Sequence, residues 1–248
     1  MANFWRIVHD VIRKSDIIVI VADARLPEIS VHKEILDKIE KEQKKYLIVF
    51  NKIDLLNAEG KKRLKETLTA YDFTMSVSAK SHDKTMALLR KLNALARGEV
   101  ATVGVVGYPN TGKSSIINAL KGRNSAPVSS RAGHTKGLQR VRVSAKISLL
   151  DTPGVIPYDE RYNVNHQTIL SSKNAESLRD PEGAVFQILE EFPHVLELFY
   201  EVPVSKDVDA TLENIANTLN IKKKGNIPDT KRAAVRVIQD WQSGKIKQ

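Results

Sequence analysis

The chain has 248 residues, of which 42% are hydrophobic and 27% are charged, and this composition is typical of a globular protein with one main domain and a smaller one. It contains no cysteine, which excludes disulfides and thiolate metal sites and fits a cytoplasmic protein. No apolar run approaches the roughly 18 residues of a membrane span, and the N-terminal MANFWRIVHD lacks a secretory pattern, so we expect no membrane association.

The formal net charge of +10 is unevenly distributed along the chain. Residues 1–165 contain 28 Lys and Arg against 17 Asp and Glu, a balance of +11, whereas residues 166–248 contain 11 and 12, a balance of −1. A basic excess of this kind suggests nucleic acid as a partner. The alternative is a lysine-rich surface that contacts only solvent.

Apolar, β-branched runs predict the strands Ile17–Ala22, Leu47–Phe50, Phe73–Val77, Thr102–Val106 and Ile147–Leu150. Helical periodicity predicts helices at His32–Lys44, Ala58–Leu68, Lys84–Ala96 and Ser114–Leu120. This alternation predicts an α/β fold with a mostly parallel sheet and helices on both faces. A further strand, Arg140–Val143, is expected to pair antiparallel with Ile147–Leu150.

The strand pattern stops near residue 165. Beyond it, periodicity predicts helices at Gly183–Phe192, His194–Tyr200, Val208–Leu219 and Thr230–Trp241. Asp207 and either Asp229 or Thr230 are expected to be N-caps. We therefore predict an α/β domain over residues 1–165 and a small helical domain over residues 166–248.

A phosphate-binding loop is predicted between the fourth strand and the helix that follows it. Gly107–Ser114, GYPNTGKS, matches the pattern G-x-x-x-x-G-K-[ST] in its required context. Backbone N–H groups and the helix N-terminus would surround the phosphates, Lys113 would reach the β- and γ-phosphates, and Ser114 would ligate Mg²⁺. The candidate phosphate-binding residues are Tyr108, Pro109, Asn110, Thr111, Gly112, Lys113, Ser114 and Ser115.

The switch residues are predicted downstream of this loop. Asp151–Gly154, DTPG, follows a strand, so Asp151 could hold Mg²⁺ and the Gly154 N–H could contact the γ-phosphate. Thr135 lies between the two motifs, where a loop threonine that closes on Mg²⁺ and the γ-phosphate is expected. The candidate catalytic residues are Lys113, Thr135 and Gly154, and the candidate Mg²⁺ ligands are Ser114, Thr135 and Asp151.

Recognition of the base is predicted upstream. Asn51–Asp54, NKID, ends a strand, and the Asp54 carboxylate could accept bonds from the N1–H and the exocyclic amino group of guanine. Adenine offers neither donor there, and bonds to charged groups are worth about 1.5–3 kcal/mol each, so guanine is preferred. The Lys52 stem would cover the base and Asn51 would tie loops together. The candidate guanine-binding residues are Asn51, Lys52, Asp54, Ser78, Ala79 and Lys80, the last three supplying a backbone N–H for the guanine carbonyl.

The order of these motifs is rotated, because the base-recognition segments precede the phosphate loop and DTPG. Loops at the carboxyl edge of a parallel sheet can assemble one site from any starting point of the chain. This order resembles the circularly permuted GTPases of the YlqF/YawG type, as do the opening WRIV…SDI…VADARLP and the closing DWQSGKI. The resemblance implies a P-loop GTPase domain with a helical C-terminal domain that binds GTP and GDP and assists large ribosomal subunit assembly, with ribosomal RNA or the large subunit as partner. Separately from the resemblance, we expect a monomer.

Catalysis departs from the usual pattern of GTPases. Some members of the family carry an N-terminal Pro-Gly-His-Met, which this chain lacks, and His9 is not assigned that role. Val155 follows Gly154 and cannot orient water, so slow intrinsic hydrolysis is expected, with a partner or ion assisting. Asn110 matches an asparagine that binds an activating K⁺ in similar GTPases, and it is equally compatible with a simple turn. His134 is a further candidate for positioning water.

Three alternatives stay open. An ATP-dependent kinase or ATPase would share the phosphate loop, although the NKID segment argues against it. A GTP-gated RNA-binding module would make hydrolysis incidental. A GTPase that acts on tRNA or at membranes is the third, and the lack of a lipidation motif weakens its membrane version.

Overall fold

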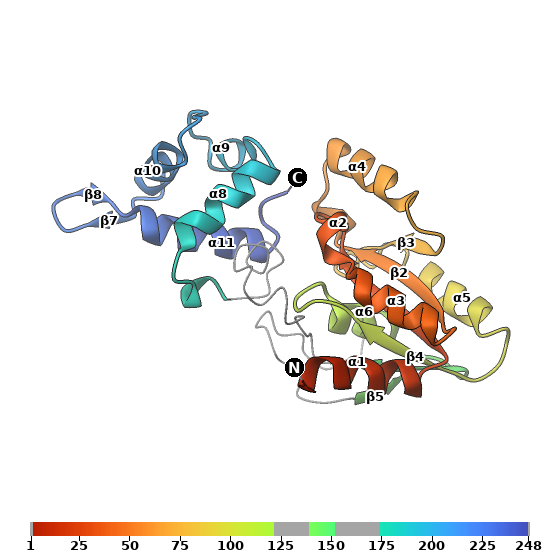
Figure 1. Cartoon of the computed structure of the whole chain (residues 1–248). Coiled ribbons are helices and arrows are strands. Elements are labelled where there is room, and N and C mark those ends of the chain that lie inside the picture. The colour runs from red at the N-terminus through yellow and green to blue at the C-terminus, as the bar shows by residue number, and fades with distance from the viewer. Residues whose placement is uncertain (1, 122–138, 152–173, 248) are drawn as a thin grey trace. The chain divides into compact units, whose positions relative to one another are not determined.

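The computed structural model describes residues 2–121, 139–151 and 174–247. The chain divides into two compact units, Met1–Arg161 and Tyr162–Gln248 (Figure 1). The predicted domain boundary at residue 165 lies outside the described residues, so it stays a prediction.

The first unit is built on a six-stranded sheet with the order β3-β2-β1-β4-β6-β5. Neighbouring strands are parallel, except that β5 runs antiparallel to β6. This confirms the predicted α/β fold class and the predicted antiparallel pair. The strands are β1 (Ile17–Asp23), β2 (Lys45–Asn51), β3 (Thr74–Ser76), β4 (Ala101–Val106), β5 (Gln139–Arg142) and β6 (Ile147–Asp151).

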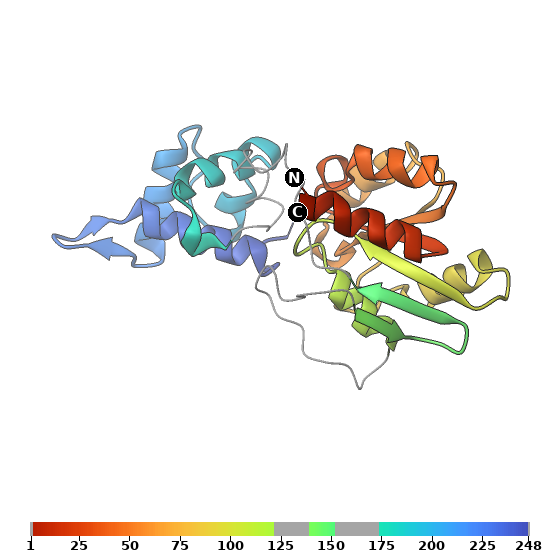
Figure 2. The same cartoon turned by 60° about the horizontal axis from the view of Figure 1, so that its bottom comes forward.

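Both faces of the sheet are covered by helices, which explains why the strands are continuously apolar rather than alternating. Every residue of β1 is buried, and successive side chains enter opposite cores. One core is completed by α1 (Ala2–Lys14), α3 (Lys33–Lys41) and α4 (Ala58–Leu68), and the other by α5 (Thr85–Leu95) and α6 (Lys113–Lys121). Figures 1 and 2 show α1 and α6 on opposite sides of the sheet.

The parallel arrangement brings the ends of distant segments to one edge. The carboxyl ends of β1, β2, β3, β4 and β6 all lie at this edge, and each of the predicted nucleotide-binding motifs within the described residues follows one of those strands. The edge therefore collects residues separated by as many as a hundred positions in the chain.

Element boundaries follow local sequence signals where those signals are strong. The helix α4 has the predicted bounds because the Asn57 side chain accepts a hydrogen bond from the Gly60 N–H at 2.9 Å and defines its start. No element was predicted for residues 2–14, where the structure has α1. The short helix α2 (Pro27–Ser30) was likewise not predicted.

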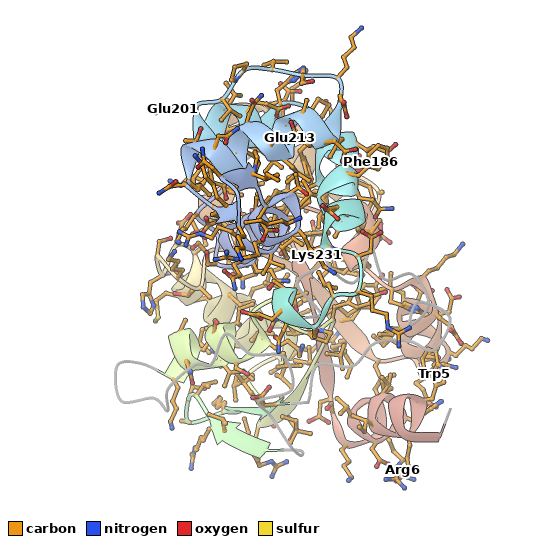
Figure 3. The ribbon with its side chains drawn as sticks, turned by 90° about the vertical axis from the view of Figure 1, so that its left-hand side faces the viewer. Trp5, Arg6, Phe186, Glu201, Glu213 and Lys231 are labelled. Carbon is orange, nitrogen blue, oxygen red and sulfur yellow. The ribbon has the colours of Figure 1, made fainter. Side chains whose placement is uncertain are left out.

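The second unit consists mainly of helices, and the side chain of Trp241 is fully buried among them. Its elements are η3 (Ala175–Ser177), α8 (Pro181–Glu191), α9 (Val195–Tyr200), α10 (Val208–Thr218), the strands β7 (Lys222–Lys223) and β8 (Ile227–Pro228), and α11 (Thr230–Gln242). Figure 3 shows the exposed side chains of Phe186, Glu213 and Lys231, which project from α8, α10 and α11.

The predicted N-caps of the second unit are confirmed. The Asp207 carboxylate accepts a bond from the Asp209 N–H at 3.0 Å, and that of Asp229 from the Arg232 N–H at 3.2 Å. The antiparallel pair β7–β8 was not predicted. Among the described helices, none has both the length and the apolar composition needed to cross a bilayer.

Candidate nucleotide-binding site

The predicted phosphate loop joins β4 to α6 and packs tightly against the neighbouring strands. Gly107 and Gly112 have φ angles of 144° and 95°, in a region that favours glycine. A Cβ atom on Gly107 would lie 2.3 Å from the Val21 carbonyl oxygen, and one on Gly112 would lie 2.1 Å from the Asn51 Nδ2 atom. A side chain would clash at both positions, so the loop lies in close contact with the ends of β1 and β2.

Lys113 begins α6 and points its ammonium group back into the loop. The side chain is buried, and Nζ donates to the carbonyl oxygens of Gly107 at 3.0 Å and Tyr108 at 2.6 Å. Burial lowers the pKa of Lys113 to about 8, an effect that Asp151 opposes and Lys52 reinforces. A buried ammonium group at the start of a helix suits an anionic ligand such as a phosphate.

Ser114 and Asp151 meet although they are far apart in sequence. The Ser114 hydroxyl donates to Asp151 Oδ2 at 3.2 Å, from the first turn of α6 to the end of β6. A hydroxyl oxygen and a carboxylate oxygen are the hard ligands that Mg²⁺ takes, so this pair fits the predicted magnesium site. Thr135, His134 and Gly154 lie outside the described residues, and their roles stay predictions.

Asn51 joins the phosphate loop to the predicted base-recognition loops. Its Nδ2 donates to the Thr111 carbonyl oxygen at 2.9 Å, and its Oδ1 accepts from the Ala79 N–H at 3.0 Å. The residue is buried at the end of β2. One side chain therefore fixes two loops that lie 28 and 60 positions away.

Asp54 is held in place by the companion loop. The Ser78 hydroxyl donates to Asp54 Oδ1 at 2.6 Å and accepts from the Ser81 N–H at 3.1 Å. Ser78 is fully buried and Asp54 is half-buried, so the carboxylate is fixed yet accessible. The Ala79 N–H already donates to Asn51, whereas Lys80 is exposed. The structure thus brings the predicted guanine-binding residues together at one edge.

The other predicted phosphate-binding residues lie in the same loop. Tyr108, Pro109 and Thr111 are buried, and the Thr111 hydroxyl donates to the Tyr108 carbonyl oxygen at 3.0 Å. Asn110 and Ser115 are half-buried, and Asn110 has a φ angle of 59°, as in a turn. Binding of K⁺ by Asn110 stays a prediction.

A buried charge cluster beside the site was missed. Asp23 ends β1, and its carboxylate accepts bonds from Arg25 and from Lys52 Nζ, the latter at 2.7 Å. Burial alone would raise the pKa of Asp23, but Arg25 and Lys52 hold it well below its ordinary value. The sequence signal for this cluster was the acidic residue Asp23 at the end of an apolar strand, in the segment Asp23-Ala-Arg25. Nothing in the sequence identified Lys52 as a partner of this carboxylate.

Comparison with known proteins agrees with this geometry. The family model of 50S ribosome-binding GTPases matches residues 102–227, and that of RsgA GTPases matches residues 5–160. The crystal structure of GNP-bound YlqF from T. maritima is similar to this chain with a TM-score of 0.70 and 26% identity, over 98% of this chain and 94% of that one.

Three curated relatives are similar over almost the whole chain. Identity is 34% to a GTP-binding protein of Methanocaldococcus jannaschii, over 97% of this chain and 65% of the relative. Identity is 31% to the GTPase grn1 of Schizosaccharomyces pombe, over 96% of this chain and 59% of the relative. Identity is 30% to the nuclear GTP-binding protein NUG1 of Saccharomyces cerevisiae, over 97% of this chain and 54% of the relative. The chain spans less than two thirds of the length of each relative. With two family models that each cover at least half of it, the chain belongs to the circularly permuted P-loop GTPases of the YlqF type.

Proposed function

We propose that this chain binds GTP with Mg²⁺, hydrolyses it, and acts as a switch in large ribosomal subunit assembly. The observation that carries the proposal is the Asn51 side chain, which bonds the phosphate loop at Thr111 and the base-recognition loop at Ala79. A side chain that fixes both loops sets the separation between a bound base and its phosphates.

Base selection follows from the geometry of Asp54. Because Ser78 holds one carboxylate oxygen, the group is oriented before ligand arrives and loses little freedom on binding. Guanine presents two adjacent donors, N1–H and the exocyclic amino group, to such a carboxylate. Adenine would leave the half-buried charge poorly paired, which is costly.

The phosphate end of the site works by positioning and charge. Phosphoryl transfer needs charge stabilisation more than covalent participation by the protein. Lys113 supplies a fixed positive charge, and the backbone N–H groups of the loop and the start of α6 supply further donors. Ser114 and Asp151 would hold Mg²⁺, which when bound neutralises charge on the phosphate oxygens.

Slow intrinsic hydrolysis is part of the proposal. Val155 cannot orient water, so Thr135, Gly154 and an external activator are the proposed contributors to catalysis. A K⁺ ion held by Asn110 is one such activator. Single-turnover hydrolysis in potassium and in sodium tests it: a faster rate in potassium is expected, and equal rates would remove the ion from the mechanism.

The ribosomal partner is supported by two observations. One family model that matches this chain describes 50S ribosome-binding GTPases. Residues 1–165 also carry a balance of +11, as expected for a protein that approaches RNA. We propose ribosomal RNA or the large subunit as the partner, a monomeric state and a cytoplasmic location.

The test combines nucleotide selectivity with subunit binding. Purified protein is expected to bind GTP and GDP at least about a hundredfold more tightly than ATP and ADP, because two hydrogen bonds to Asp54 are at stake. It is also expected to need Mg²⁺ for hydrolysis and to hydrolyse GTP faster when large subunits are added. Equal affinity for ATP would favour an ATPase. GTP-dependent subunit binding without stimulated turnover would favour a GTP-gated RNA-binding module, and stimulation by tRNA alone would favour a tRNA GTPase.

A further inference from the structure

The Asp23 carboxylate is the centre of a buried cluster at the carboxyl end of β1. Its Oδ1 accepts from the Arg25 Nε–H at 3.1 Å, and its Oδ2 accepts from Arg25 Nη2 at 2.9 Å and from Lys52 Nζ at 2.7 Å. The side chains of Asp23 and Arg25 have no exposed surface, and that of Lys52 is 18% exposed. The paired side chains of Asp23 and Arg25 therefore lie away from water, where their mutual hydrogen bonds are electrostatically stronger.

Arg25 fixes the orientation of this carboxylate. The two-point contact between the guanidinium and both carboxylate oxygens is the rigid fork geometry of paired arginine and carboxylate groups. The Arg25 N–H also donates to Asp23 Oδ1 at 3.1 Å, and the Ser30 hydroxyl contacts the Asp23 backbone. Asp23 and Arg25 already neutralise each other, so neutralisation of Asp23 does not explain the third contact, from Lys52.

Lys52 is held at both ends. Its backbone has a φ angle of 72°, in the left-handed region, directly after Asn51 and two residues before Asp54. Its Nζ is bonded to Asp23, which lies next to Asn51 in the parallel register of β1 and β2. The hydrocarbon stem therefore runs from the base-recognition segment across the sheet edge to the neighbouring strand.

This placement also sets the charge near the phosphate loop. Lys52 is close enough to Lys113 to lower its pKa, so two ammonium groups share this part of the site. Burial lowers the pKa of Lys52 as well, and Asp23 opposes that shift. The carboxylate of Asp23 thus favours the charged form of Lys52 against the effect of burial, and it holds the ammonium group at the end of β1.

We propose that Asp23 is a positioning residue for guanine-nucleotide binding, because it anchors the Lys52 ammonium group and so holds the lysine stem extended over the base site before ligand arrives. The inference rests on the proposed function, since it concerns the same site. Without the anchor, Lys52 would sample many rotamers and would have to be ordered on binding. The freezing of one long side chain corresponds to roughly a threefold to tenfold loss of affinity.

A double-mutant cycle separates this role from a purely structural one. Asp23→Asn keeps an oxygen acceptor for Arg25 but removes the charge that holds Lys52, and Lys52→Met keeps a stem of similar length without the ammonium group. Each variant is expected to bind GDP about threefold to tenfold more weakly, and the double variant no more weakly than either single variant. Ser30→Ala is the matched control, because it disturbs the same strand end without touching the carboxylate.

Three results would overturn the proposal: unchanged GDP affinity in Asp23→Asn, losses that multiply in the double variant, or an equal loss in Ser30→Ala. If Asp23→Asn does not fold, the wild-type protein still gives an answer by NMR of the lysine ammonium groups. The Lys52 signal is expected to exchange with water more slowly than that of exposed Lys80 before nucleotide is added, and equal exchange would contradict the anchor.

Failure of the proposed function would give a different result from failure of the inference about Asp23. A wild-type chain that binds GDP no better than ADP would overturn both the function and this inference. Guanine preference that is intact in the wild type, together with unaltered affinity in both single variants, would overturn the inference alone.

Discussion

The Asn51 side chain donates a hydrogen bond to the Thr111 carbonyl oxygen at 2.9 Å, linking the end of β2 to the middle of the phosphate loop. In chain order the asparagine comes 60 residues before its partner. The contact shows how a rotated motif order still yields one site, because the sheet and not the chain order places the two loops side by side.

Replacing Asn51 by Ala should weaken both the fold and the site. Two buried backbone groups, the Thr111 carbonyl and the Ala79 N–H, lose their partner, so the free energy of unfolding should fall by about 2–4 kcal/mol. Urea unfolding and GDP titration measure the two effects. Asn57→Ala, which removes only an exposed helix cap, should cost about 1 kcal/mol and leave GDP affinity unchanged. Equal behaviour of the two variants would contradict the linking role of Asn51.

Replacing Ser78 by Ala should loosen Asp54 without removing it. The hydroxyl bond to Asp54 Oδ1 orients the carboxylate before GDP binds, and the loss of this orientation should weaken GDP binding about threefold to tenfold. The matched control is Ser81→Ala, which keeps the backbone N–H that contacts Ser78 and lies on the surface. A fluorescent GDP analogue measures both variants, and a loss of equal size in the control would refute the role given to Ser78.

Replacing Gly112 by Ala tests how closely the loop packs. Gly98→Ala serves as the control in the same unit, since Gly98 also has a positive φ angle but its Cβ would meet nothing nearer than 3.7 Å. Gly98→Ala should cost about 1–2 kcal/mol of backbone strain and leave GDP affinity intact. Gly112→Ala should displace Asn51 and lower GDP affinity at least about tenfold, the value of one hydrogen bond. Similar GDP affinity in the two variants would contradict the close contact.

In the helical unit, Asp240 should make the free energy of unfolding depend on pH in the acidic range. Its carboxylate accepts from Tyr200, Arg236 and Lys245, and these bonds lower its pKa although burial opposes them. The stabilisation is therefore present above the unfolded pKa of about 3.9 and is lost as the pH falls through the lower folded value. Asp240→Asn should cost about 1–2 kcal/mol at pH 7 and much less near pH 2.

Urea unfolding is monitored by the fluorescence of Trp241, which is adjacent to Asp240 in the sequence and fully buried. Trp5→Phe removes the second tryptophan signal, which comes from the other unit. Glu213→Gln, on the exposed surface of α10, is the control and should change stability little at either pH. A cost of Asp240→Asn that stays constant from pH 7 to pH 2 would contradict the assignment.

The strands and most helices could be predicted because their signals are local. The run Ile17–Ala22 is apolar at every position and became β1, and Asn57 marks the start of α4. The helix α1 was not predicted, although Val8, Val11 and Ile12 have helical spacing and are buried. The pair β7–β8 was missed because strands of two residues carry no periodicity.

The site was predicted as a set of residues but not as a network. Motif spacing indicated Asn51, Asp54 and Ser78, yet no local pattern states that Asp23 bonds Lys52 across 29 positions. That contact depends on the register in which Asp23 lies beside Asn51. Long-range register is a property of the packed sheet, so it became visible only in the structure.

The most direct test of the account is a change of base preference in Asp54→Asn. Xanthine keeps the N1–H of guanine and has a carbonyl in place of the exocyclic amino group, so an asparagine amide, with one acceptor and one donor, matches it. Titrations of wild type and variant with GDP, XDP and ADP give the answer. The wild type should prefer GDP and the variant XDP, each by at least about tenfold, the equivalent of one hydrogen bond. An unchanged preference for GDP in the variant would contradict the claim that this sheet edge recognises guanine through Asp54.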